Sequence, residues 1–182
     1  MASGAAVSTD HGVIGTIRRT ISRQADEYSR GAERPLGGYA VIIVAYAVAT
    51  GAGVALVRAR RRSLPSSISL RDLALVAAAT FQLSRVITKK PITSALRAPF
   101  TTYDGTAGPA ELQESVRGHG VRHAVGELVT CPFCTAHWIV TAFGFGLVLS
   151  PEVTRLVASM LTAEAAADFL QFAYARIQQS DG

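Results

Sequence analysis

The chain has 182 residues and a mass of 19.2 kDa, which is room for one domain of ordinary size and not comfortably for two. Charged residues make up 17 % and hydrophobic residues 49 %, with a mean hydropathy of +0.27, and these values exclude a disordered chain, a collagen and a coiled coil. Two cysteines are too few for a disulfide framework, and a net charge of +5 is compatible with nucleic acid or with an anionic membrane surface.

The first 35 residues carry a basic and amphipathic pattern. Apolar residues recur there at helical spacing with arginines on the remaining faces, namely Ile14, Ile17, Ile21, Ala25 and Tyr28 against Arg18, Arg19, Arg23 and Arg30. A helix with this pattern lies on a lipid surface and is attracted to anionic headgroups. We therefore expect residues 1–35 to form a basic amphipathic arm that contacts the membrane, with a solvated arm as the alternative.

The segment Leu36 to Val57 is predicted to be the first transmembrane helix. Its 22 residues include no Asp, Glu, Lys, Arg or His, and a helix of that length reaches about 33 Å, enough to cross a hydrocarbon core of about 30 Å. Because 35 residues precede it, a signal anchor fits better than a cleaved signal peptide.

Small residues recur at every fourth position of this helix in two adjacent stripes. The stripes are Ala45, Ala49 and Gly53, and Ala47, Gly51 and Ala55. Such stripes let another helix approach closely, although an alanine-rich composition alone gives the same pattern. Directly after the helix stand Arg58, Arg60, Arg61 and Arg62. Their position beside an apolar helix favours contact with phosphate headgroups over nucleic acid.

Residues 70–178 are expected to form a membrane domain of three apolar segments. Leu128 to Ser150 is long enough to span, because its 23 residues include no Asp, Glu, Lys or Arg. Leu73 to Ile87 is shorter and contains Arg85, which would need a snorkelling position or a partner such as Asp72, Glu127 or a headgroup phosphate. This segment either spans in a thinned bilayer or is re-entrant or buried. Val153 to Tyr174 carries three charged residues and is expected inside a bundle or at the interface.

The fold class predicted by these segments is an all-α polytopic transmembrane protein with three to four spans. Residues 88–127 form a polar segment in which we predict a short helix starting near Pro109, a residue suited to a first helical turn. With four alternating spans, this segment and the N-terminal flank together hold ten Lys and Arg against five on the opposite side. That excess predicts a cytoplasmic loop over residues 88–127, and a three-span arrangement predicts the same.

Both cysteines and three of the four histidines lie between His119 and His137. Pro132 lacks an N–H and suits a first helical turn, so Cys131 is expected to be the N-cap of the helix that follows. Cys134 and His137, three residues apart in that helix, project from one face.

One chemistry for this cluster is a metal site. Zinc takes four Cys or His ligands around a tetrahedron. Cys131, Cys134 and His137 could supply three of them, and His123 or His119 the fourth. Zinc is the one cofactor that these residues predict.

Two other interpretations stay open. A redox dithiol needs two cysteines at CxxC spacing at a helix start, where the helix dipole stabilises a thiolate, so Cys131 could act as nucleophile and Cys134 as resolving thiol. The letters CPFC resemble a glutaredoxin active site, but no strand and helix pattern of that fold surrounds them. Alternatively, the cysteines are packed side chains, and Phe133, His137 and Trp138 belong to an interfacial aromatic belt.

Three blocks of the sequence resemble a family of small bacterial membrane proteins, domain of unknown function 1360. The blocks are DLALVAAATFQLSRVIT, LRAPF and GELVTCPFCTAHWIV, with matching positions at Arg85 to Ile87, Leu96 to Phe100, Glu127 to Cys134 and Trp138. The resemblance covers about residues 70–175. It implies an integral protein of the bacterial cytoplasmic (inner) membrane and no established activity.

Motifs for nucleotide binding, serine hydrolysis and zinc peptidases are not found in the sequence. We therefore expect a non-enzymatic membrane module that assembles with itself or with a membrane protein partner, with Cys131, Cys134, His137 and His123 as its candidate metal ligands. The alternative is a membrane thiol-disulfide oxidoreductase that uses Cys131 and Cys134. A transporter or channel subunit is supported only by Arg85, Glu164 and Asp168.

Overall fold

The computed structural model describes residue 23, residues 27–28 and residues 34–180. The chain forms two compact units, of which the second begins at Gly37. The architecture of this second unit is described below. Most of the basic arm expected at residues 1–35, Arg18 and Arg19 included, lies outside the described residues.

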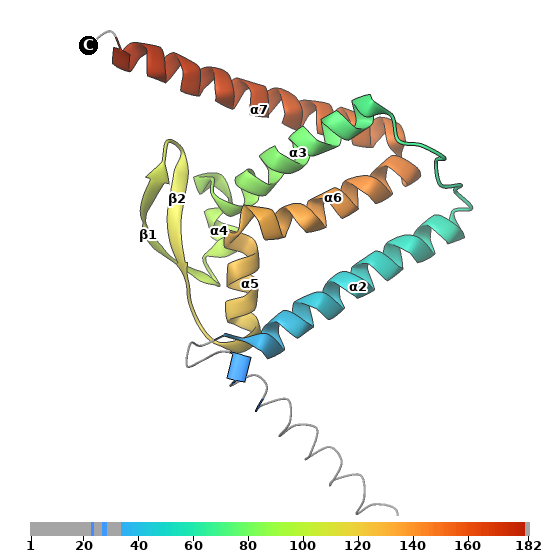
Figure 1. Ribbon diagram of the computed structural model, residues 1–182, viewed down its shortest axis with the longest axis horizontal. Helices are drawn as coiled ribbons and strands as arrows, with labels where there is room; N and C mark the ends of the chain where they lie inside the picture. Colours follow the sequence, from blue (N-terminus) through green and yellow to red (C-terminus); the bar gives the residue numbers. More distant parts are fainter. Residues whose placement is uncertain (1–22, 24–26, 29–33, 181–182) are drawn as a thin grey trace, which may run out of the picture. The chain divides into compact units, whose positions relative to one another are not determined.

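Helices make up most of the described chain. Their order, with one hairpin between them, is α2 (Leu36–Ala59), α3 (Leu70–Thr88), the short 3-10 helix η1 (Pro91–Thr93), α4 (Ser94–Arg97), β1 (Thr101–Gly108), β2 (Glu111–Val116), α5 (Gly120–Thr130), α6 (Pro132–Leu149) and α7 (Pro151–Ser180) (Figure 1). Among the described residues, α2, α6 and α7 are long and apolar enough to cross a membrane. The predicted all-α polytopic membrane fold is confirmed.

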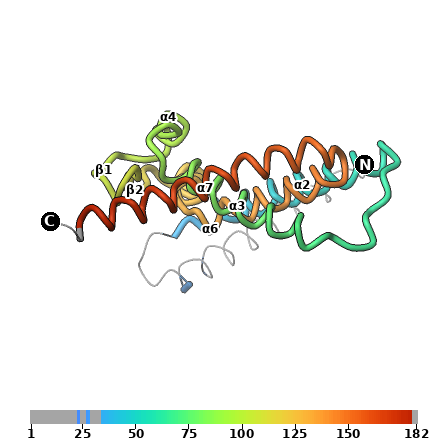
Figure 2. The backbone as a smooth tube through the Cα atoms, turned by 90° about the horizontal axis from the view of Figure 1, so that it is seen from above, coloured from blue at the N-terminus to red at the C-terminus, as the bar shows by residue number. Residues whose placement is uncertain are grey.

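α3 packs against α6 and α7 (Figure 2), and the hydrophobic core lies between these helices. It is formed by Val76 and Ala79 of α3, Ile139 and Phe143 of α6, and Ala158 of α7. Burying these side chains against one another, at about 25 cal/mol per Å² of apolar surface, stabilises the three-helix contact. The short apolar segment of the sequence is therefore a helix packed inside the bundle, and it is not among the three helices suited to span a membrane.

Ion pairs and hydrogen bonds show that α3 and α7 run parallel. The Arg155 guanidinium donates two hydrogen bonds, of 2.8 and 2.9 Å, to the Asp72 carboxylate near the start of both helices. Further along, the Gln82 amide donates to Asp168 at 2.8 Å. Because α6 turns into α7 at Ser150, α6 runs in the opposite direction to both.

The alternating directions bring distant parts of the chain to the same end of the bundle. The hairpin, α4 and α5 lie at the end where α3 finishes, and residues 60–69 lie at the other end, beside the α6–α7 turn (Figure 1). The arginines Arg58, Arg60, Arg61 and Arg62 are exposed at that second end. Their contact with lipid headgroups stays a prediction.

A break at Cys131 corrects the expected span from Leu128 to Ser150. Leu128 belongs to α5, and the apolar helix α6 begins only at Pro132. Proline has no N–H to donate and disfavours helical angles at the preceding residue, and Cys131 is extended at φ −99° and ψ 107°. The chain therefore changes direction between α5 and α6 (Figure 1).

The helix predicted to start near Pro109 is wrong, because the chain forms an antiparallel hairpin there. Pro109 and Ala110 make its two-residue turn, with Ala110 at φ +58°. Along β2, Leu112, Glu114 and Val116 are half-buried while the residues between them are exposed. This period of two is that of a strand, and pairing with β1 overrides the helical propensity of the local sequence.

Arg97 of α4 joins the hairpin to the end of α3. Its side chain is fully buried. The Nε atom of the guanidinium donates to the Glu114 carboxylate at 2.5 Å. Nη1 donates to the carbonyl oxygens of Ile87 at 2.7 Å and Lys90 at 3.2 Å, and to the Thr93 hydroxyl at 2.7 Å. Arg97 therefore satisfies carbonyl groups that the end of α3 leaves without helical partners.

α2 contacts the rest of the domain along one side only. Gly38 lies against α5, and Tyr39 donates a hydrogen bond to the Glu127 carboxylate. Tyr46 shares a hydrogen bond of 2.7 Å with the Thr141 hydroxyl, and Gly53 faces the ring of Phe145. Apart from Gly38 and Val57, every residue of α2 is exposed or half-buried.

We predict that Arg97→Met unfolds the cap formed by the hairpin and α4. The substitution leaves the buried Glu114 carboxylate unpaired, which typically destabilises by about 3–5 kcal/mol. Thermal unfolding of the full chain in detergent measures the loss. Arg117→Met is the control, because the side chain of exposed Arg117 makes one hydrogen bond, to the Ala98 carbonyl, and we expect a change below about 1 kcal/mol. Equal shifts in both variants would contradict the role given to Arg97.

The adjacent glycines Gly37 and Gly38 give a matched test of the α2–α5 contact. A Cβ at position 38 would lie 2.6 Å from the Gly120 carbonyl oxygen, whereas nothing lies within 4 Å of one at position 37. We expect Gly38→Ala to loosen α2, seen as faster proteolysis of residues 60–69, and Gly37→Ala to leave the rate unchanged or slower, because alanine is the better helix former. The opposite order of rates would show that α2 does not pack closely there.

Candidate functional site

Cys131 caps the start of α6, as predicted. Its Sγ accepts a hydrogen bond from the backbone N–H of Cys134 at 3.3 Å, and Pro132 occupies the first helical position. Both thiols are free. Cys131 is half-buried and Cys134 is exposed, so the interpretation of two buried, packed cysteines does not hold for Cys134.

The histidines of the predicted metal set point to other partners. The Nδ1 atom of His123 lies 3.1 Å from the Gly118 carbonyl oxygen, and its Nε2 lies 3.6 Å from the Glu127 carboxylate. The ring of His137 packs on Tyr46 of α2 with 4.8 Å between centroids. The ring of His137 therefore helps to attach α6 to α2, and that of His123 contacts groups of α5 and of the turn before it.

The four candidate ligands are not brought together. Across residues 34–180, no group of three or more His, Cys, Asp and Glu side chains is arranged to hold a metal ion. Cys131 and Cys134 are neighbours, but His123 lies on α5 and His137 stacks on α2. This arrangement does not fit the tetrahedral zinc site that Cys131, Cys134, His137 and His123 predict.

A pocket at the end of the α3–α7 pair is the second candidate site. It has a volume of about 810 Å³ and lies among α3, α7, the start of η1 and the hairpin turn. Its polar lining side chains are Gln82, Arg85, Lys90, Glu111, Asp168 and Gln171. Its apolar wall includes Phe81, Ile92, Phe169 and Phe172.

Lys90 bridges two carboxylates of α7 at the edge of this pocket. Its ammonium lies 2.7 Å from the Glu164 carboxylate and 2.9 Å from that of Asp168. Burial alone would lower the pKa of Lys90, but the hydrogen bonds with Glu164 and Asp168 outweigh it and raise the pKa above its ordinary value. Lys90 therefore stays charged at neutral pH.

Arg85 pairs with Glu111, at the start of β2. Its guanidinium also lies 5.6 Å from the ring centroid of Phe81, within the range of a cation–π contact. The partners considered from the sequence, Asp72 and Glu127, are engaged elsewhere, since Asp72 binds Arg155 and Glu127 accepts from Tyr39. The prediction missed Glu111 because it assigned that residue to a helix.

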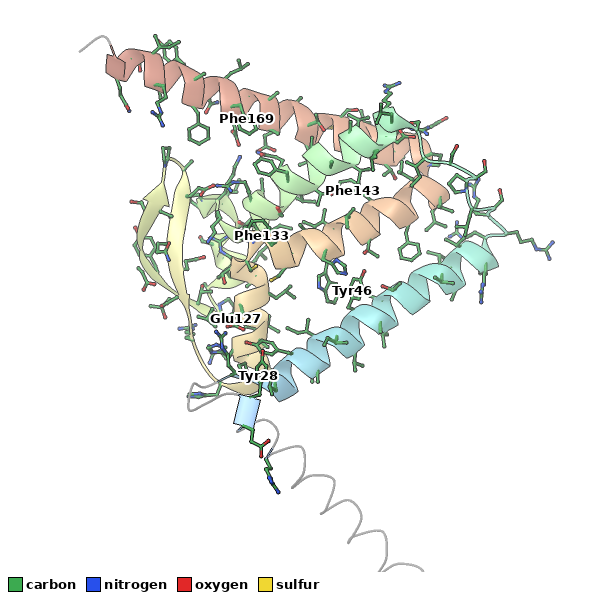
Figure 3. All side chains as sticks on the ribbon, in the orientation of Figure 1. Tyr28, Tyr46, Glu127, Phe133, Phe143 and Phe169 are labelled. Carbon is green, nitrogen blue, oxygen red and sulfur yellow. The ribbon has the colours of Figure 1, made fainter. Side chains whose placement is uncertain are left out.

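Aromatic rings line the other side of the pocket. The rings of Phe81 and Phe169 are stacked, 6.0 Å apart and 13° from parallel, and Figure 3 shows Phe169 on the side of α7 that faces α3. Glu164, Asp168 and Phe172 recur at every fourth position of α7. That spacing, which places three side chains on one face of a helix, was the signal in the sequence that could have located this site.

Comparison with known proteins places both candidate sites within one family match. The family described as Protein of unknown function (DUF1360) matches residues 75–174. This range contains the CPFC motif and every polar residue of the pocket, and it begins after α2. No curated protein and no solved structure matches the chain. Because the match covers more than half of the 182 residues, the chain belongs to the DUF1360 family, a family of unknown function.

Proposed function

We propose that the protein is a non-enzymatic membrane module that assembles with a second copy or another membrane protein through α2. The observation that carries this proposal is the exposed side of α2. Gly51 has no atom within 4 Å of a Cβ built on it, and Ala47 and Ala55, one turn away on either side, are exposed. At 100° per residue this stripe lies opposite the side that carries Tyr46 and Gly53.

A stripe of small residues supports close helix packing in lipid. Association there depends on van der Waals contact between closely approaching backbones, since lipid already solvates apolar side chains. Val48 and Val54 flank Gly51 on its two sides and are 65 % and 39 % exposed. A second helix could therefore seat its backbone on Ala47, Gly51 and Ala55 between these valines.

The charged side chains of the domain also support a structural role. Asp72 with Arg155, Arg97 with Glu114, and Lys90 with Glu164 are ion pairs that join different elements. Cys131 caps α6. These groups hold helices in place, which is what a rigid assembly module requires.

Cysteine cross-linking in native membranes tests the proposal. In a chain with Cys131→Ser and Cys134→Ser, we expect Gly51→Cys to form a cross-linked species and Ala52→Cys, rotated by about 100° on the helix, to form several-fold less. A product of twice the chain mass identifies self-assembly, and a product of another mass identifies a partner protein. Equal cross-linking of both variants, or monomer in both, would refute assembly through this stripe.

A thiol-disulfide oxidoreductase is the second candidate, favoured by two free thiols at the start of α6. In that reaction the Cys131 thiolate attacks a disulfide of a substrate protein and releases one of its thiols. Cys134 then attacks the mixed disulfide, so the CPFC pair is oxidised while the substrate disulfide is reduced.

Trapping of the mixed disulfide separates the two candidates. For an oxidoreductase, Cys134→Ser should accumulate a covalent complex with a substrate protein that reductant dissolves, and Cys131→Ser should not. His137→Ala should leave trapping unchanged, since a dithiol needs no His ligand. For the assembly module we expect no such complex with either cysteine variant, as judged by non-reducing electrophoresis of membranes.

A further inference from the structure

We propose that the pocket between α3 and α7 binds the headgroup of a zwitterionic phospholipid, with the ammonium on the carboxylates and the phosphate on Arg85 and Lys90. This inference is independent of assembly through α2. It rests on the depth of the pocket in the membrane, the balance of charges that line it, and its aromatic wall.

The length of α7 is compatible with a pocket at the depth of lipid headgroups. α7 has 30 residues and is therefore about 45 Å long, whereas a hydrocarbon core is about 30 Å thick. Asp168 stands about 26 Å along α7 from Pro151. When the α6–α7 turn lies near one boundary of the core, Asp168 lies near the other, and Phe172 and Ala175 lie just beyond it.

Charged residues on α3 and α7 form two layers that are closer together than a hydrocarbon core is thick. About 20 Å separates Asp72 from Arg85 along α3, and the same distance separates Arg155 from Asp168 along α7. The bundle therefore has two charged layers, one at each end. The layer with Arg85 and Asp168 is the one that opens into the pocket.

The charges that line the pocket sum to zero, and Glu164, which pairs with Lys90 beside the lining, adds one negative charge. Arg85 and Lys90 are cationic, and Glu111 and Asp168 are anionic. An ion that brings one net charge into a partly buried site leaves that charge uncompensated. A zwitterion can exchange partners with these ion pairs without changing the net charge of the site, and the additional Glu164 carboxylate favours a phospholipid with an ammonium over one with a net negative headgroup.

The polar end of the pocket is built from side chains that are held in place. Gln82 is 1 % exposed and donates to Asp168. The charged side chains keep some exposure, between 21 % for Glu111 and 37 % for Arg85, so that a ligand can reach them. The pocket is therefore both preorganised and accessible.

The apolar wall suits the remainder of a phospholipid. Phe81 and Phe169 stack on each other, and the rings of Phe169 and Phe172 are 60 % and 46 % exposed. Aromatic faces attract ammonium groups through their quadrupole and also pack on acyl chains. The combination of an aromatic wall with paired charges matches an amphiphile better than a polar metabolite.

Two alanines of α7 allow a matched test that leaves every charged residue in place. Ala175 lines the pocket, while Ala173 does not, and it points about 160° away on the same turn of the helix. Both are exposed. Ala175→Trp should fill the pocket, and Ala173→Trp should add the same side chain to the opposite side of α7.

Native mass spectrometry of the full chain in detergent, titrated with phosphatidylethanolamine or phosphatidylglycerol, measures binding. We expect one phosphatidylethanolamine per chain in the native protein and in Ala173→Trp, with about fivefold weaker binding of phosphatidylglycerol. Ala175→Trp should weaken phosphatidylethanolamine binding about tenfold. Glu111→Gln should narrow the preference between the two lipids, because it removes one negative charge from the site.

Competition with soluble phosphoethanolamine identifies the source of the ligand. If bound phosphatidylethanolamine is displaced by more of the lipid and not by phosphoethanolamine, the acyl chains contribute to binding. If phosphoethanolamine displaces the lipid at a similar concentration, the pocket is a site for the free zwitterion. Either result supports the proposed headgroup chemistry. Equal binding by both tryptophan variants, or tighter binding of phosphatidylglycerol than of phosphatidylethanolamine, would overturn the proposal.

Discussion

The buried ion pair between Arg97 and Glu114 is the interaction on which the polar end of the domain depends. It joins α4 to the hairpin, while the same guanidinium binds carbonyl oxygens at the end of α3. The hairpin in turn carries Glu111, whose partner is Arg85. The position of one charged wall of the pocket is therefore set by an arginine that does not itself line it.

Sequence reasoning succeeded where the determining interactions are local. The length of the apolar run predicts α2, and Pro132 predicts the cap at Cys131, because both depend on neighbouring residues. It failed for the hairpin, whose register depends on β1, and for the partner of Arg85, which lies 26 positions away. The Cys and His cluster shows the same limit. Residues close in sequence are separated in space because the chain turns between α5 and α6.

The two candidate sites differ in how the fold uses them. The CPFC motif lies at a break between helices, and one of its thiols already serves as a cap. The pocket is formed by four segments of the chain that meet at the end of the α3–α7 pair, so no single segment of the sequence displays it. Both lie within the family match, whereas α2 precedes it. The proposed assembly surface therefore lies outside the family match, and the pocket lies inside it.

The parallel pairing of α3 with α7 has a consequence for synthesis. The ribosome completes α3 more than 60 residues before it begins α7, so Asp72 and Gln82 enter the membrane without their final partners. Unpaired polar groups are unfavourable in lipid. Nascent α3 must therefore stay in a hydrated or protein-lined site, such as the translocation machinery provides, until Arg155 and Asp168 of α7 have been synthesised. Folding of this bundle finishes with its last helix.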